Sequence, residues 1–93
     1  MIGRIASMTG SPDALIQAER HFLDQGRSHF KNLKGLVSLH IFFDAAQGKA
    51  AVISTWQDEQ SSKTSFVALA GLRKELSALG VTVAIQHYDV LGE

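Results

Sequence analysis

The chain has 93 residues, of which 45% are hydrophobic and 19% are charged, and its nine basic and nine acidic residues cancel. A chain of this length and composition is typical of a single globular domain, so disorder and collagen-like repeats are excluded and one domain is expected over residues 1–93. Because the charge is balanced and neither sign forms a long block, nothing attracts a phosphate backbone, and nucleic acid is not expected as a partner.

The sequence contains no cysteine. This absence excludes disulfides, iron–sulfur clusters, thiolate zinc sites and cysteine nucleophiles, and it fits a reducing compartment. The N-terminal residues 1–10 lack the apolar core of a signal peptide, and no stretch approaches the roughly 18 to 20 apolar residues of a membrane helix. We therefore expect a cytoplasmic protein that does not enter a membrane.

The first third of the chain predicts a strand and then a helix. Ile2, Ile5 and Met8 precede a breaker at residues 9–12, which indicates a strand over 1–9. Ser11 is placed to cap the helix, with Pro12 at its first position. Small or apolar residues, together with His29, then recur every three or four residues, and Gly35 is expected to end the helix. They are Leu15, Ala18, Phe22, Gly26, His29 and Leu33.

The rest of the chain predicts a hairpin, a helix and a last strand. Two apolar runs at 36–44 and 50–56 are separated by a turn at 45–49. Asp58 can cap a second helix, Gly80 can end it, and a strand is expected over 81–90. The apolar stripe of this helix consists of Phe66, Leu69, Leu72, Leu76 and Leu79.

The expected order is strand, helix, strand, strand, helix, strand. Two halves of similar length in this order favour the α+β class and a ferredoxin-like βαββαβ topology. We therefore predict a four-stranded antiparallel sheet with two helices on one face.

Side chains alternate along a strand, so the hairpin residues divide between the two faces of the sheet if the turn has an even number of residues. The face expected under the helices carries Val37, Leu39, Ile41, Phe43, Val52, Ser54 and Trp56. The opposite face, with Leu36, Ser38, His40, Phe42, Ala51, Ile53 and Thr55, is too apolar for a solvated sheet face. This predicts a homodimer through the sheet faces. The alternative is a monomer for which Ser38, His40 and Thr55 make the surface polar enough.

The segment 53–60, Ile-Ser-Thr-Trp-Gln-Asp-Glu-Gln, runs from the end of a strand into a helix. It resembles the signature of the antibiotic biosynthesis monooxygenase-like group of the dimeric α+β barrel superfamily, and the element order matches over nearly the whole chain. The resemblance implies a homodimer in which two sheets close a barrel. It also implies an apolar cavity in each subunit, between its sheet and its helices.

Cofactor-independent, quinone-forming monooxygenases of this group use a Trp at the strand end, an Asn four residues before it, a Tyr shortly after it and an Arg on the second helix. Trp56 and Arg73 match two of these positions, whereas Val52 replaces the Asn and Ser62 stands near the position of the Tyr. The resemblance implies oxygenation of a small aromatic or polyketide-like molecule without a cofactor. The two departures keep a second hypothesis open, a non-catalytic dimeric ligand-binding or interaction module of the same fold.

Haem-degrading relatives place an iron-ligating His on the second helix and an Asn on the first strand. Residues 58–79 contain no His, and the first strand contains no Asn. We therefore do not expect a haem cofactor.

The candidate catalytic residues are Arg73 and His29. Arg73 could polarise a carbonyl or bind a carboxylate, or it could be a solvated helix residue. His29 could act as a base above the sheet, or it could be a partly buried structural residue. The candidate ligand-binding residues are Trp56, Val52, Ser54, Phe22 and Leu39, and Trp56 could equally be core. No two histidines have the i, i+4 spacing of a helical metal pair, so no metal is expected.

Overall fold

The computed structural model describes residues 1–92, without the side chains of residues 26 and 27. Its elements are β1 (Ile2–Thr9), α1 (Pro12–His21), a π-helical turn (Phe22–Gly26), α2 (Arg27–Phe30), β2 (Leu36–Asp44), a 3₁₀ turn (Ala45–Gln47), β3 (Lys49–Trp56), α3 (Glu59–Ala68), α4 (Ala70–Ala78) and β4 (Thr82–Asp89). The sheet has the order β2-β3-β1-β4, with every neighbouring pair antiparallel.

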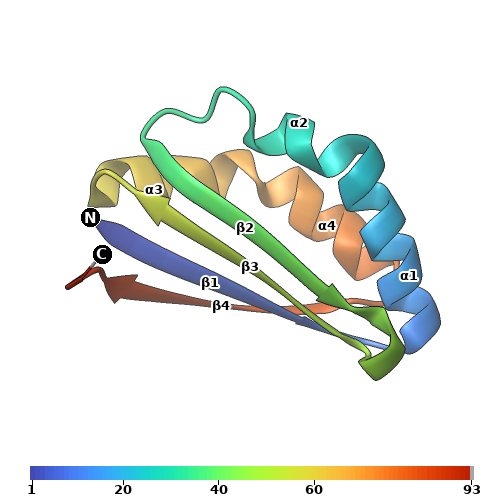
Figure 1. The fold of residues 1–93 in the computed structure, drawn as a ribbon. Coiled ribbons are helices and arrows are strands. Elements are labelled where there is room, and N and C mark those ends of the chain that lie inside the picture. Colours follow the sequence, from blue (N-terminus) through green and yellow to red (C-terminus); the bar gives the residue numbers. More distant parts are fainter. Residues whose placement is uncertain (93) are drawn as a thin grey trace.

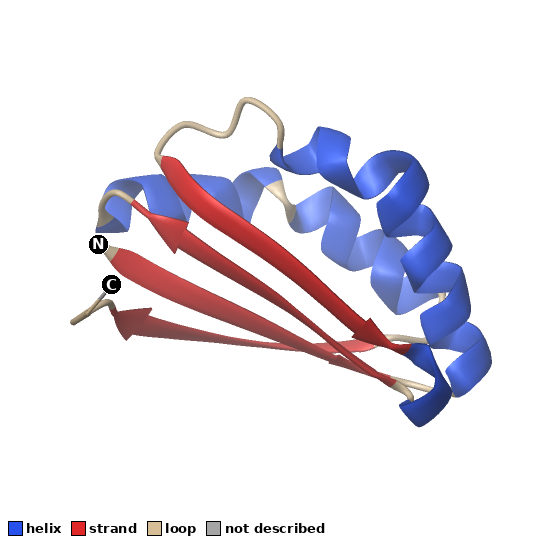
Figure 2. Cartoon of the chain, viewed as in Figure 1, coloured by secondary structure: helices blue, strands red, loops and turns tan. Residues whose placement is uncertain are grey.

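All of the helices lie on one face of this sheet, and the other face is uncovered (Figure 1, Figure 2). The predicted α+β class and ferredoxin-like topology are confirmed. In the part of the chain that is described, no helix is long and apolar enough to cross a membrane.

Both predicted helix caps are present. The Ser11 hydroxyl accepts a hydrogen bond from the Ala14 amide at 3.1 Å, with Pro12 as the first helical residue. The Asp58 carboxylate accepts one from the Ser61 amide at 2.7 Å. These bonds satisfy amides that have no partner inside the helix, which fixes where α1 and α3 begin.

The helix after Pro12 departs from the predicted stripe. The π-helical turn inserts one residue into its regular period, so Phe30 rather than His29 reaches the core. The helix also ends earlier than Gly35, at Phe30, and Asn32 with a φ of 70° begins the loop. Asn is one of the few non-glycine residues that adopt this left-handed conformation readily.

The hairpin turn leaves four residues between the paired Asp44 and Lys49, as the assumption of an even number required. Gly48 has a φ of 68°, and a Cβ at this position would lie 2.2 Å from the Gly10 carbonyl oxygen. The close approach of these two turns therefore requires a glycine. It brings the hairpin tip against the start of α1, where the Gly10 amide donates to the Gly48 carbonyl at 3.1 Å.

The prediction of which hairpin side chains face the helices is right for most of the hairpin and wrong at its start. Leu39 and Ile41 pair with Ser54 and Val52 on the helix side. A β-bulge between Leu36 and Ser38 reverses the phase, so Leu36 packs on the core and Val37 is exposed. Without this bulge, Val37 would have faced the helices.

The core lies between the sheet and the helices and is closed by apolar side chains from almost every element. Its buried members are Met8, Ala14, Leu15, Ala18, Phe22, Phe30, Val52, Leu69, Leu72, Leu76 and Val81. The predicted stripe of the second helix is thus confirmed at Leu69, Leu72 and Leu76, whereas Phe66 is partly exposed.

Candidate functional site

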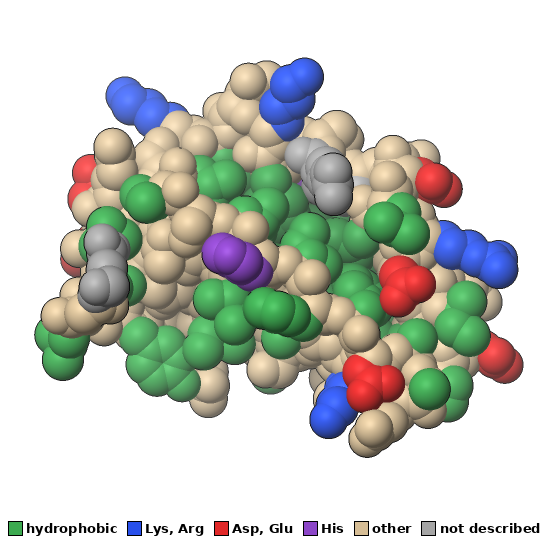
Figure 3. Space-filling model, in the orientation of Figure 1, with side chains coloured by type: hydrophobic (Ala, Val, Ile, Leu, Met, Phe, Trp, Pro, Cys, Tyr) green, Lys and Arg blue, Asp and Glu red, His purple; other side chains and the backbone are tan. Residues whose placement is uncertain are grey.

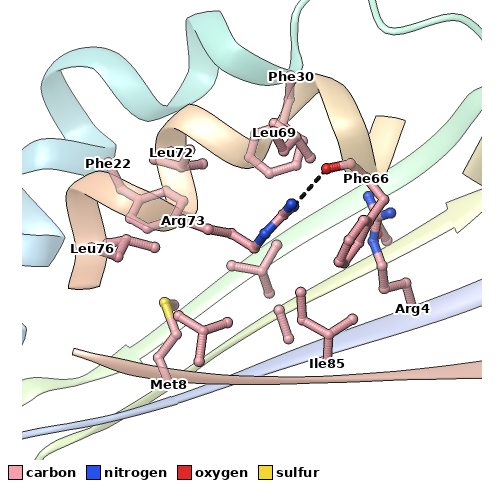
Figure 4. Close-up of a pocket in the computed structure, with 14 residues that line it drawn as sticks. Arg4, Met8, Phe22, Phe30, Phe66, Leu69, Leu72, Arg73, Leu76 and Ile85 are labelled. Carbon is pink, nitrogen blue, oxygen red and sulfur yellow. Dashed lines mark hydrogen bonds between the residues drawn. The ribbon is translucent and has the colours of Figure 1, made fainter. Parts of the chain in front are cut away.

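A cavity of about 50 Å³ lies between the sheet and the helices. Its walls are apolar except for two arginines and one serine (Figure 4). The lining residues are Arg4, Ala6, Met8, Phe22, Phe30, Val52, Ser54, Phe66, Leu69, Leu72, Arg73, Leu76, Val83 and Ile85. This set includes no Asp, Glu, Lys, His or Tyr, so the two guanidinium groups are the only charged groups in the part of the lining that the structure describes.

Arg4 projects from β1 into the interior, where it is only 5% exposed. Its guanidinium donates to the Ser62 carbonyl at 3.2 Å and to the Ser65 hydroxyl at 3.0 Å, and it stacks on Trp56. None of the ion pairs among the described residues includes Arg4. Burial, and after it the positive charge of Arg73, lower the pKa of Arg4. Arg4 is therefore a buried cation that has no counter-charge among the described residues.

Arg73 lies at the other side of the cavity, with the Phe66 ring between the two arginines in the view of Figure 4. Its guanidinium carbon is 3.8 Å from the centre of that ring, and it donates to the Phe66 carbonyl at 2.6 Å. The bond is available because α3 ends at Ala68, which leaves the last carbonyls of that helix without helical partners. The break between α3 and α4 thus positions Arg73 over the cavity.

Trp56 is completely buried at the end of β3. Its indole N–H donates to the Ser54 hydroxyl at 3.0 Å, so Ser54 rather than Trp56 lines the cavity. Trp56 acts on the site indirectly, because its ring supports the Arg4 guanidinium from behind.

The structure brings together some of the predicted site residues. Arg73, Val52, Ser54 and Phe22 line the cavity. Leu39 does not; it lines a separate surface groove between β2 and α2, with Phe30, Lys31, Leu36 and Ile41.

His29 also lies outside the lining set. Its Nε2 atom is 3.8 Å from a Glu75 oxygen, on the helix side of the molecule. The π-helical turn explains this position, since the stripe predicted for a regular helix placed His29 on the core face.

Arg4 is the residue that the sequence analysis missed. It occupies the same alternation phase as Ala6 and Met8, which face the helices, so its inward direction follows once the strand is known. The sequence signal that could have identified Arg4 is an arginine at an inward-facing position of a predicted strand.

Several solved structures have the same arrangement of helices and strands as this chain. A candidate antibiotic biosynthesis monooxygenase from Deinococcus radiodurans aligns over 100% of this chain and 95% of its own, with a TM-score of 0.80 and 17% identity. A variant of SnoaB, a cofactor-independent oxygenase from Streptomyces nogalater, aligns over 99% and 94%, with a TM-score of 0.74 and 16% identity. The chain has the antibiotic biosynthesis monooxygenase fold.

A dimeric ferredoxin-like protein from an uncultured marine organism has the same fold, with a TM-score of 0.79, 12% identity and coverage of 99% of this chain and 95% of its own. No family model matches the sequence, and no curated protein matches it. The likeness is therefore one of structure, in line with the resemblance expected from residues 53–60.

The structure shows where Val52 and Ser62 lie, the two residues that depart from the pattern implied by the resemblance. Val52 contributes an apolar side chain to the cavity wall where the resemblance implied an Asn. Ser62 is buried, and its carbonyl accepts from Arg4. This chain therefore has fewer neutral polar groups in its cavity than the resemblance implied, and a second guanidinium.

Proposed function

We propose that the protein binds a small acidic molecule with an apolar or aromatic body in the cavity beneath its helices. The observation that carries this proposal is the buried guanidinium of Arg4, which forms no ion pair with any residue that the structure describes and faces a lining without Asp or Glu. Removing a cation from water costs several kcal/mol unless a counter-charge compensates it. A carboxylate, phenolate or enolate oxygen of the ligand would supply that charge.

The two arginines define how such a ligand would be held. Arg4 and Arg73 retain N–H donors beyond those that bond Ser62, Ser65 and Phe66, because each guanidinium has five. Once the Phe66 ring has rotated from between them, an anionic oxygen would accept charge-assisted hydrogen bonds from both. The remaining walls are aliphatic or aromatic and suit an apolar body.

Entry requires the cavity to open, because 50 Å³ is far below the roughly 300 Å³ or more of typical ligand sites. The residues placed to open it are Phe66, which is 37% exposed, and Arg73, which stacks on it. Rotation of these two side chains would widen the cavity toward solvent without movement of the sheet. An anion would favour this rotation by offering Arg73 a stronger acceptor than the Phe66 carbonyl.

The reaction we propose is cofactor-independent oxygenation, which is the activity named for SnoaB. In such chemistry the substrate anion itself reduces oxygen, so the protein must favour the anion and position it. No side chain in the lining can act as a general base near neutral pH. The substrate would therefore ionise through its own acidity, helped by the two guanidinium groups.

A non-catalytic binding or interaction module of the same fold is the second candidate. The small cavity volume favours it, since a filled interior needs no ligand. An interaction module with a filled interior would leave the charge of Arg4 uncompensated, which is why we place this alternative second.

We also propose that the protein is a homodimer through the uncovered face of the sheet. In the register of the sheet the middle of this face carries Gly3, Ile5, Ser7, Ser38, His40, Phe42, Ala51, Ile53, Thr55, Ala84, Gln86 and Tyr88, and its hairpin end carries the paired Asp44 and Lys49. Phe42 is 54% exposed and Ile53 is 37% exposed. Figure 3 shows hydrophobic side chains around a histidine in the middle of its view, with most of the charged side chains farther out. A partly apolar face with an uncharged middle and charges at one end is typical of an interface with an apolar core and a polar rim.

Oxygen uptake tests the proposed reaction. The protein, free of added metal and flavin, is mixed with anthrone, an acidic polycyclic ketone, and oxygen and anthraquinone are followed. We expect enzyme-dependent uptake that Arg73→Ala reduces at least about tenfold. Arg20→Ala, at an exposed position of α1, is the matched control and should leave uptake unchanged. Binding of anthrone without uptake would favour the non-catalytic module, and absence of both would contradict the proposal for this substrate class.

A further inference from the structure

Three side chains that could ligate a metal converge outside the cavity, where α1 and α2 meet α4. They are His21, His29 and Glu75, and one potential ligand atom from each lies within 4.8 Å of the other two. A Glu75 oxygen is 2.8 Å from His21 Nε2 and 3.8 Å from His29 Nε2. We propose that these three residues bind a divalent transition metal of the zinc class.

The π-helical turn is the feature that creates this cluster. Eight residues of a regular α-helix turn by about 800°, which would leave His21 and His29 about 80° apart around the helix. Residues Phe22–Gly26, between the two histidines, form a wider turn that takes up an additional residue. The eight residues then complete about two full turns, and the two imidazoles share one face, with ring centroids 6.2 Å apart.

The ligand types and their separations fit a zinc-class ion. Two ligands at about 2.1 Å from a tetrahedral metal lie about 3.4 Å apart. The observed separations of 2.8 Å, 3.8 Å and at most 4.8 Å bracket this value, so side-chain rotation is sufficient to form the site. Two imidazoles and one carboxylate favour zinc and related transition metals over magnesium or calcium, which prefer oxygen ligands.

The surroundings of the Nε2 atom of His21 are a second observation in favour of a metal ligand at this position. Its Nε2 atom is buried and has no aligned hydrogen bond, although the Glu75 oxygen lies only 2.8 Å away. Buried polar atoms in folded proteins normally have such a partner. A metal ion would engage the Nε2 lone pair and the carboxylate oxygen together.

The proposed site would tie the helix pair α1–α2 to α4 over the cavity. None of the three residues lines the cavity, but their chain neighbours Phe22 and Leu76 do. The side chains of His21, His29 and Glu75 are 19%, 30% and 48% exposed, so the fourth coordination position faces solvent. A bound metal would thus fix the roof of the cavity, and the inference stands independently of what the cavity binds.

Metal titration tests this inference. Protein without a histidine tag is stripped with chelator, and Zn²⁺ binding is measured by calorimetry, with Co²⁺ absorption as a second readout of the coordination. We expect one ion per chain, and His29→Ala and Glu75→Gln should each weaken binding at least about tenfold. The matched controls His87→Ala and Glu59→Gln, at exposed positions away from the cluster, should keep the original affinity.

Two results would overturn the inference. One is absence of Zn²⁺ binding at micromolar concentration by the original protein. The other is loss of affinity in the controls equal to that in the cluster variants. Far-ultraviolet circular dichroism checks that each variant is folded, and Glu75→Gln, which keeps the shape of the side chain, decides the outcome if His29→Ala does not fold.

Discussion

The guanidinium of Arg4 stacks on the ring of Trp56, with its central carbon 4.6 Å from the ring centroid. This contact, together with the bonds to Ser62 and Ser65, holds a positive charge against an apolar cavity. A cation–π contact offsets part of the cost of removing a guanidinium from water, but it does not replace a carboxylate. The pair therefore suggests a site in which stability is given up to keep a charge available for a ligand.

Arg4→Met tests this trade-off. The substitution removes the buried charge and keeps much of the volume, while Ser65 still donates to the Ser62 carbonyl at 2.7 Å. We expect the free energy of unfolding to stay within about 1 kcal/mol of the original or to rise, because an uncompensated buried charge is lost. Denaturant unfolding measures this change. A loss of about 3 kcal/mol or more would mean that Arg4 is structural.

Arg73 is expected to contribute to ligand binding through its directed donors as well as its charge. Arg73→Lys keeps the charge but loses the planar group that stacks on Phe66 and bonds its carbonyl. We predict weaker binding of an aromatic carboxylate in Arg73→Lys, and a loss of about tenfold to a hundredfold in Arg73→Ala. Titration by nuclear magnetic resonance checks this order of affinities for the carboxylate. Equal affinity in all three proteins would remove Arg73 from the site.

The proposed dimer predicts that a charge on the uncovered sheet face separates the subunits. Ile53→Lys places an ammonium in the middle of that face, where burial would be costly. We expect the dimer dissociation constant to rise at least about a hundredfold. Val67→Lys is the control, because Val67 is exposed on α3, away from the sheet. Light scattering at micromolar concentration gives the masses, and a monomeric original protein would contradict the dimer.

The cap of α3 predicts a pH dependence of stability. Hydrogen bonds from Ser61 lower the pKa of Asp58 below its usual 3.8. A carboxylate with a lowered pKa stabilises the fold fully above the unfolded value, and this contribution is lost as the pH falls through the lower folded value. Asp58→Asn keeps a capping oxygen but does not titrate. We therefore expect the melting temperatures of the two proteins to differ less at pH 3 than at pH 6, and a constant difference would contradict the capping role.

The element order, both caps and most of the core could be predicted from the sequence because they follow from local rules. Ser11 and Asp58 stand at positions where a helix needs an acceptor, and Leu69, Leu72 and Leu76 keep a helical period. The ferredoxin-like topology then follows from the order of the elements. The cytoplasmic location and the homodimer stay predictions.

Two departures from regular geometry account for the wrong predictions at Leu36, Val37 and His29. The β-bulge at Leu36–Ser38 exchanged the faces of Leu36 and Val37, and the π-helical turn moved His29 from the core face to the neighbourhood of Glu75. Each inserts one residue into a period, and no residue pattern in the sequence marks the insertion.

The most direct test of the account compares benzoate with benzamide, two ligands of nearly the same shape that differ in charge. Their binding is measured by nuclear magnetic resonance titration of the original protein and of Arg4→Met. The account predicts that the original protein binds benzoate at least about tenfold more tightly than benzamide, and that Arg4→Met reduces this preference, since only Arg73 then remains to bind the carboxylate. Equal affinity of the original protein for the two molecules, or a preference that is undiminished in Arg4→Met, would contradict it.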